Sequence, residues 1–402
     1  MLLFALALVA FAPTPAPPDT TDAPPAGDGV EVRTRFAPSA LYSRDYGLGI
    51  GVGVGVRNLG AAGTDLTADV RLHRHFQGAE VAFRTSALDA RRVSADVSIG
   101  GSTTDRRFYA GVGPAPISAS DVDLSHDAAW AEAGVRVYPV GTTVLSVRPS
   151  AEGRTDRSDG VARDWGTVDG LDGASRRAVE AAVGRRTGVW LGAELATDLR
   201  DRPGRPRRGV LAQAEHRRFV TLAGADLGLA QTAGSVVGYV PLGEVVTGLV
   251  HGAAAVTRRT DDGPGAIPFV YLPTLDGGLG APFRPNRLMG RDVLAVGAGV
   301  RATLVDLYGL YGLDVTAVGY LGNAYDGVAD QFRPAVSFGP GGVLDGDGRA
   351  ALRPGLALGL ALADLDDGRA VAGVGLGLGP GGPALVSVRV AYDLRRLRPR
   401  LY

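Results

Sequence analysis

The sequence predicts an all-β fold, a transmembrane antiparallel β-barrel of about 16 strands. Three observations predict it. Sixty of the 402 residues are glycine, and each glycine costs roughly 1 kcal/mol relative to alanine in a helix interior. Segments of about ten residues alternate apolar and polar side chains with a period of two, as strands with two unlike faces do. The connections between these segments are rich in turn-forming residues.

Composition excludes several classes of function. The 42 basic and 42 acidic residues balance, so no net field attracts nucleic acid, and we expect no nucleic-acid partner. Lysine is absent, which we interpret as a bias of genome composition. Cysteine is also absent, which excludes disulfides, thiolate metal sites and cysteine nucleophiles. We predict no cofactor and no metal.

The chain is expected to have three parts. Residues 1–12, with an apolar run too short to span a bilayer as a helix, are predicted to be a signal peptide for export. The proline-rich and acidic residues 13–40 are expected to be a disordered lead. Residues 41–402 are expected to form the barrel. No later segment has 18 uncharged apolar residues in a row, so no transmembrane helix is predicted.

The first alternating segment is "GLGIGVGVGV", residues 47–56. It does not have the G-x-G-x-x-G spacing of a dinucleotide-binding loop. We predict the first strand here, with its aliphatic side chains towards lipid and its glycines towards the lumen. A glycine-rich strand has a poorly specified register, so we predict a seam that can open at this strand. The predicted seam residues are Gly47, Gly49, Gly51, Gly53 and Gly55.

The same alternation recurs along the chain, in residues 64–75, 190–198, 292–304 and 385–392. The connections near residues 154–177, 257–268 and 321–331 are longer than those near 74–78 and 240–244, as in barrels with short periplasmic turns and long outer loops. One pair of strands with its turn and loop needs roughly 42 residues, which gives about 16 strands. The soluble alternative, a large β-sandwich or propeller, predicts bulkier side chains on the buried face.

Several segments, in order, resemble the C-terminal barrel of the Omp85 superfamily, also called bacterial surface antigen or D15-like proteins. Residues 53–70 look like that family's first hairpin, and "RRFYAGVGP" (106–114) is similar to its Arg-Phe-Tyr-Gly-x-Gly stretch. The most specific segment, "DLRDRPGRPRRGVL" (198–211), resembles the family's Asp-x-Arg-Asp, Pro, Arg-Gly hairpin. The matching residues are Asp198, Arg200, Asp201, Pro206 and Gly209.

The resemblance implies a long loop folded into the lumen and anchored by an arginine paired with an acid. The corresponding stretch is 272–301, which lacks the family's Arg-Gly-aromatic triplet. Asp314 is the expected acid partner. The anchor candidates of the loop are Gly277, Gly278, Phe283, Arg284, Arg287 and Arg291, and arginines solvated in a wet pore are the alternative.

The resemblance also implies a function. We expect a barrel in the bacterial outer membrane that acts in protein assembly, translocation or surface display. Its partners would be the lipid of that membrane and a protein client or a periplasmic partner. The family's periplasmic POTRA domains have no room before residue 41, so we expect a barrel-only member. A passive pore or structural barrel is the alternative.

No residues nominate an enzyme, and we expect none. His73 and His75 could share a strand face as metal ligands, but a solvated lumenal pair is favoured. Ser125, His126 and Asp127 have the residue types of a hydrolytic triad, but adjacent strand residues face opposite ways. The tryptophans are expected in interfacial girdles or loops.

Overall fold

A computed structural model describes residues 32–43, 47–59, 63–88, 93–104, 112–113, 125–139, 145–159, 173–202, 205–261, 265–275, 288–307, 311–338, 347–364, 370–379, 382–390 and 392–393. The strands are β1 (Arg33–Ser43), β2 (Gly47–Arg57), β3 (Thr64–His73), β4 (Phe76–Leu88), β5 (Val93–Thr104), β6 (Ser125–Val137), β7 (Leu145–Asp159), β8 (Gly184–Asp198), β9 (Gly209–Ala223), β10 (Gly228–Pro241), β11 (Val246–Arg259), β12 (Asp292–Leu307), β13 (Tyr311–Tyr325), β14 (Phe332–Val336), β15 (Ala350–Asp364), β16 (Ala370–Gly379), β17 (Gly382–Val390) and β18 (Tyr392–Asp393). The helical segments are α2 (Gly173–Glu180), η3 (Phe269–Tyr271) and α3 (Val328–Gln331).

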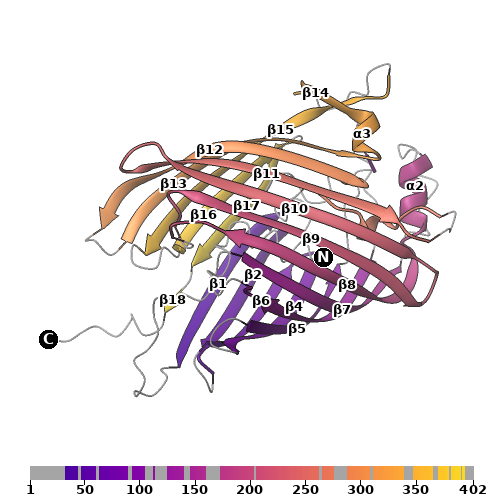
Figure 1. Cartoon of the computed structure of the whole chain (residues 1–402), viewed down its shortest axis with the longest axis horizontal. Coiled ribbons are helices and arrows are strands. Elements are labelled where there is room, and N and C mark those ends of the chain that lie inside the picture. Colours follow the sequence, from indigo (N-terminus) through magenta and orange to yellow (C-terminus); the bar gives the residue numbers. More distant parts are fainter. Residues whose placement is uncertain are drawn as a thin grey trace.

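The strands form one antiparallel ring (Figure 1). Each strand from β1 to β13 pairs with the next, β13 pairs with β15, and β15 to β17 continue the series. The ring then returns, because β17 pairs with β1. Thirteen strands, β1 to β13, and three more, β15 to β17, make 16 in the ring. The prediction of an antiparallel barrel of about 16 strands is confirmed.

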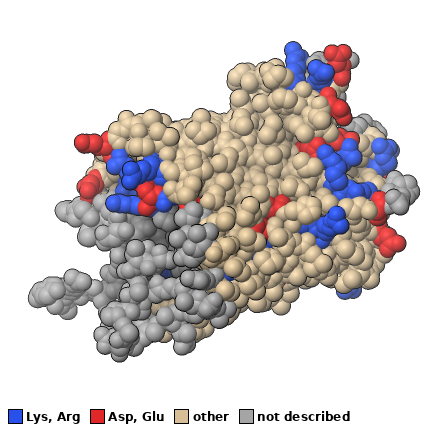
Figure 2. All heavy atoms as spheres, viewed as in Figure 1, with Lys and Arg blue, Asp and Glu red and all other residues tan. Residues whose placement is uncertain are grey.

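The two faces of the wall differ as the alternation predicts. On β12, Val296 and Leu304 face outward and are 43% and 61% exposed, whereas Val293 and Ala295 face the lumen and are buried. Figure 2 shows the result on one side of the molecule, where charged side chains gather towards the two ends and the band between them is mostly uncharged. Such an apolar band is what a bilayer requires of a barrel's outer surface. Among the described residues, no helix has the length and apolarity to cross a membrane.

The two ends of the barrel carry different connections. The chain enters β1 and leaves β17 at the end where residues 199–208, 242–245 and 308–310 join strands, which we call the short-turn end. The opposite end, the long-loop end, has the connections 105–124, 160–183, 260–291 and 326–349. There α3 and β14 project beyond the barrel, and β14 pairs parallel with the start of β15 (Figure 1).

The first strand lies earlier than predicted. β1 begins at Arg33, so residues 33–40, which we expected in the disordered lead, form part of the wall. The segment alternates, with Phe36 and Tyr42 exposed on the outer face, but Pro38 and the proline-rich residues before it conceal the pattern. Proline lacks a backbone donor and is confined to edge strands and strand ends in most sheets.

The glycine-rich segment is β2, between β1 and β3, and is therefore not at the seam. The predicted faces hold, since Leu48 and Ile50 are exposed on the outer side. The lumenal glycines have a packing role. A Cβ at Gly49 would lie 2.2 Å from the His73 ring and one at Gly51 would lie 2.6 Å from the Ser39 hydroxyl. The predicted seam at Gly47, Gly49, Gly51, Gly53 and Gly55 is corrected to the contact between β1 and β17.

Candidate functional site

The connection between β11 and β12 (residues 260–291), which we call the infolded loop, packs its described arms, 265–275 and 288–291, inside the lumen. Its two described arms pair with each other, because the Leu275 N–H donates to the Leu288 carbonyl at 2.9 Å. Leu275 and Leu288 are fully buried against the lumenal faces of β11 and β12, where Ala253, Ala255, Val293 and Ala295 lie. Small side chains on this wall let the loop approach closely. The predicted infolding is therefore present. In this part of the loop the arms pack on β11 and β12, the two strands that the loop connects.

The loop then contacts a second part of the wall, β8 and β9, through η3. Phe269 and Tyr271 are buried in a cluster with Trp190 of β8 and Phe219 of β9. The ring centroids of Tyr271 and Phe219 are 5.0 Å apart, and those of Trp190 and Phe219 are 5.1 Å apart, within the range of favourable aromatic pairs. α2 adds Val179 to the same cluster. Trp190 therefore packs inside the lumen. We had expected the tryptophans in interfacial girdles or loops, so this expectation is wrong for Trp190.

A buried charge cluster completes this contact. The Tyr271 hydroxyl donates to Asp156 Oδ2 at 2.9 Å, and Arg154 donates twice to the same carboxylate at 2.7 Å. Burial, and then the charge of Asp156, raise the pKa of Tyr271 above its usual range, so the phenol keeps its proton and remains a donor. We call Tyr271, Asp156 and Arg154 the lumenal latch. Sequence reasoning missed it, although the alternation of β7 puts Glu152, Arg154 and Asp156 on one face.

Residue types of a hydrolytic triad meet beside the latch. His126 lies 2.8 Å from the Ser158 hydroxyl and 3.4 Å from Asp156. All three side chains are buried, and Asp156 is already bound by Arg154 and Tyr271. A triad needs an accessible nucleophile, so we assign these residues to the packing of the loop. The absence of enzymatic activity stays a prediction.

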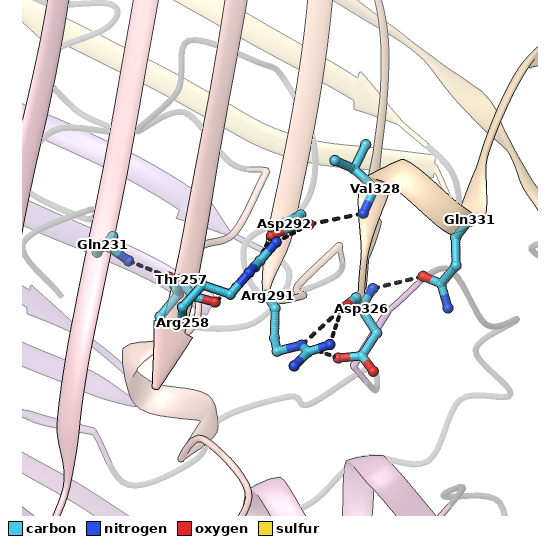
Figure 3. Close-up of polar contacts among 8 residues, drawn as sticks. All are labelled: Gln231, Thr257, Arg258, Arg291, Asp292, Asp326, Val328 and Gln331. Carbon is cyan, nitrogen blue, oxygen red and sulfur yellow. Dashed lines mark hydrogen bonds and ion pairs between the residues drawn. The ribbon is translucent and has the colours of Figure 1, made fainter. Parts of the chain in front are cut away.

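The predicted anchor of the loop is wrong for Arg291, and its other candidates are not tested. Gly277, Gly278, Phe283, Arg284 and Arg287 lie outside the described residues. Arg291 does not reach Asp314, because its guanidinium donates to the carbonyl and the carboxylate of Asp326 at the long-loop end (Figure 3). Figure 3 also shows Asp292, the first residue of β12, held by Arg258 and by the Val328 N–H of α3. The metal-ligand pair is not formed either, since His73 is in β3 and His75 lies in the following turn.

Asp314 instead binds the turn between β8 and β9. Arg205 donates to both carboxylate oxygens of Asp314, at 2.9 and 2.7 Å, and the Thr303 hydroxyl donates to one of them at 2.8 Å. The Asp314 side chain is only 6% exposed. Arg301 of β12 donates to the Pro206 carbonyl of the same turn. We call this contact the short-turn clamp, because it draws the β8–β9 turn inward onto β12 and β13.

The hairpin residues recognised by resemblance build the turn that presents Arg205. Arg200 makes a two-pronged contact with Asp198, at 2.8 and 2.7 Å. The Asp201 carboxylate accepts backbone N–H groups of Arg202, Arg207 and Arg208 at 3.0, 2.9 and 3.3 Å. Gly209 ends the turn with a φ of +107°, a conformation that side chains rarely adopt. Pro206 contributes its carbonyl to Arg301.

Replacing Gly209 by alanine is expected to destabilise the barrel by about 1–3 kcal/mol, because of strain at the positive φ. A Cβ there would also lie 2.2 Å from the Leu199 carbonyl oxygen. The midpoint of urea unfolding, followed by the heat-modifiable band on a gel, measures the effect. Gly238→Ala is the control, since its Cβ would meet nothing within 4 Å. Equal midpoints for the two variants would contradict the assignment.

Fold and site together define a transmembrane antiparallel barrel with the described arms of one of its own loops packed inside its lumen. No protein-family model matches the chain, and no curated protein is similar to it in sequence. Solved structures are similar in fold. BamA from Haemophilus ducreyi lacking POTRA domains 1–3 superposes with a TM-score of 0.59 at 13% identity, over 90% of this chain and 71% of that one. CdiB from Escherichia coli gives 0.56 at 11% identity, over 91% of this chain and 64% of that one.

These two proteins are members of the Omp85 superfamily. The fold of this chain is that of the Omp85-type outer-membrane barrel, and the resemblance inferred from sequence is confirmed at that level. The chain spans less than two thirds of the length of CdiB.

Proposed function

We propose that this barrel acts in the bacterial outer membrane in the insertion, translocation or surface display of another macromolecule. In this proposal the seam between β1 and β17 opens sideways, and the infolded loop closes the lumen while the seam is shut. The client would be a protein, with or without a separate periplasmic partner. The proposal contains no chemical step and no cofactor.

The observation that carries the proposal is the short ladder at the seam. β1 has five registered pairs with β17 and two with β18. The other neighbours in the ring have eight to fifteen among the described residues. Pro38 lies in the gap between the two runs and offers no backbone donor. Among the described residues, which do not include Ala391 or residues 394–402, this ladder has the fewest registered pairs in the ring, and in this proposal it is the contact that parts.

Locking the seam is expected to abolish the activity. The chain has no cysteine, so the variant Ala40→Cys, Val388→Cys introduces a single pair of thiols at registered positions. The assay is the rate at which a urea-unfolded eight-stranded β-barrel protein inserts into vesicles that contain the purified protein. The reduced variant should accelerate insertion over empty vesicles, and oxidation should return the rate to that baseline.

The matched control locks an ordinary contact of the wall. Ala254 and Leu294 are registered partners on β11 and β12, and their double cysteine variant should be equally active when oxidised and reduced. If the oxidised seam variant inserts the client as fast as the reduced one, lateral opening is not the mechanism. If neither form exceeds empty vesicles, the passive or structural barrel becomes the better reading.

A further inference from the structure

The outer face of the barrel carries a polar patch on β9, β10 and β11. Arg218 of β9 and Arg258 of β11 both point outward and are exposed. Each is the registered partner of Ala230 on β10, so the two arginines lie in one row on either side of a small side chain. Neighbouring strands are about 4.8 Å apart, which places the two Cα atoms about 10 Å apart.

The next row on the same face is also polar. His216 and Thr232 are registered partners, both are exposed, and the His216 Nδ1 lies 2.9 Å from the Thr232 hydroxyl. The four side chains form one patch, which we call the outer arginine patch (Arg218, Arg258, His216 and Thr232). An arginine that faces the bilayer side of a barrel is costly to bury in lipid, and no contact of the Arg218 side chain within the described part of the chain accounts for its place there.

The height of the patch on the wall fits the lipid headgroups. Along β10, the outward side chains below the patch are apolar, and Val236, Val240 and Leu242 are 45%, 52% and 62% exposed. The strand from Ala230 to Leu242 rises about 30 Å at about 3.3 Å per residue and a tilt of about 40°. That is the thickness of a bilayer's hydrocarbon core. The patch therefore lies towards the long-loop end of the apolar band, with the exposed Val220 and Leu222 of β9 beyond it, and its arginines can extend along the outer face to the headgroups.

Only one of the two arginine charges of the patch is balanced by the protein. Arg258 is paired with Asp292, which also accepts the Val328 N–H (Figure 3), yet 46% of the Arg258 side chain stays exposed. Arg218 has neither an ion pair nor a hydrogen bond of its guanidinium within the part of the chain that the structure describes. Guanidinium groups bind phosphate oxygens in a two-pronged geometry. Arg218 can offer this geometry, and Arg258, whose fork binds Asp292, adds a second positive charge on a strand about 10 Å away.

We propose that the outer arginine patch binds the phosphate headgroup of an anionic membrane lipid at the long-loop end. The acyl chains would run down the apolar face past Val236 and Val250, which is 58% exposed. Arg218 supplies the uncompensated charge, Arg258 the second guanidinium, and His216 and Thr232 polar contacts to the headgroup. The site is independent of whether the seam opens.

The test is native mass spectrometry of the full-length protein in a neutral detergent with phosphatidylglycerol or phosphatidylcholine added. The wild type should retain phosphatidylglycerol several-fold better than phosphatidylcholine, and Arg218→Gln should lose that preference. Arg333→Gln, which changes an exposed arginine on the projecting β14, should leave it intact. The heat-modifiable band on a gel confirms that each variant is folded.

Three outcomes would overturn the proposal. Equal retention of the two lipids by the wild type would remove charge recognition. Retention of phosphatidylglycerol by Arg218→Gln at the wild-type level would remove the patch as its site. Complete displacement of the lipid by millimolar inorganic phosphate would mean a site for free anions and not for a lipid.

Discussion

Replacing Tyr271 by alanine is expected to convert a closed barrel into a conducting one. The wild type should show little ion current in a planar bilayer, because the infolded loop is held inside the lumen against β8, β9, β11 and β12. Removing a buried aromatic side chain costs about 3–5 kcal/mol. Since each 1.4 kcal/mol is about a factor of ten, the open population should rise by about two to nearly four orders of magnitude.

The conservative variant separates the two parts of the contact. Tyr271→Phe keeps the stacking on Trp190 and Phe219 but loses the hydrogen bond to Asp156. A hydrogen bond to a charged group contributes about 1.5–3 kcal/mol, so Tyr271→Phe should conduct at an intermediate frequency. Phe338→Ala, at an exposed aromatic residue outside the lumen, should behave as the wild type.

Two results would contradict this prediction. A large, steady conductance in the wild type, unchanged in Tyr271→Ala, would mean that the loop is no plug and would favour the passive pore. A wild type and a Tyr271→Ala variant that are both closed would mean that the lumenal latch does not hold the loop.

Among single substitutions in the β8–β9 turn, Arg205→Ala is expected to lower the free energy of unfolding the most. The variant leaves Asp314 buried with Thr303 as its remaining partner, and breaking a buried ion pair from one side typically costs about 3–5 kcal/mol. The urea midpoint of the heat-modifiable band should fall accordingly. Arg205→Lys should recover only part of the loss, because a lysine cannot bind both carboxylate oxygens in the same plane.

Two companions make this result interpretable. Arg202→Ala removes an exposed arginine of the same turn whose described hydrogen bond comes from its backbone, so its midpoint should stay at the wild-type value. The double variant Arg205→Gln, Asp314→Asn removes both charges and should be more stable than Arg205→Ala. If Arg205→Ala and Arg202→Ala unfold at the same urea concentration, the short-turn clamp does not stabilise the barrel.

The barrel itself could be predicted from sequence because the period-two pattern is a local property. Each strand shows its lipid face directly, as Leu294 to Leu304 do on β12, and the repeat length sets the number of strands. β1 escaped prediction because Pro38 interrupts its pattern and the preceding prolines indicate disorder. The seam was therefore assigned one strand too late, to the glycines of β2.

The two sites could be predicted only in part. Infolding of the loop followed from the resemblance, but Arg205 and Asp314 are 109 positions apart, and no local pattern joins them. An acid on β13 was correctly singled out, whereas its cation comes from the β8–β9 turn and not from the loop. For Tyr271, the aromatic run "FVY" in a loop was the available signal, since large apolar side chains in a connection need something to pack against.

The uneven ladder around the ring also has a mechanical consequence. β17 is held by five pairs on one side and by eight on the other, whereas β12 and β13 share fifteen. Under a force applied to the C-terminal end, the last strand should peel away first, and the resistance should rise as the rupture moves towards β13. The ladder with the fewest pairs should therefore separate first, and the wall at β12 and β13 should keep its shape after the seam has failed.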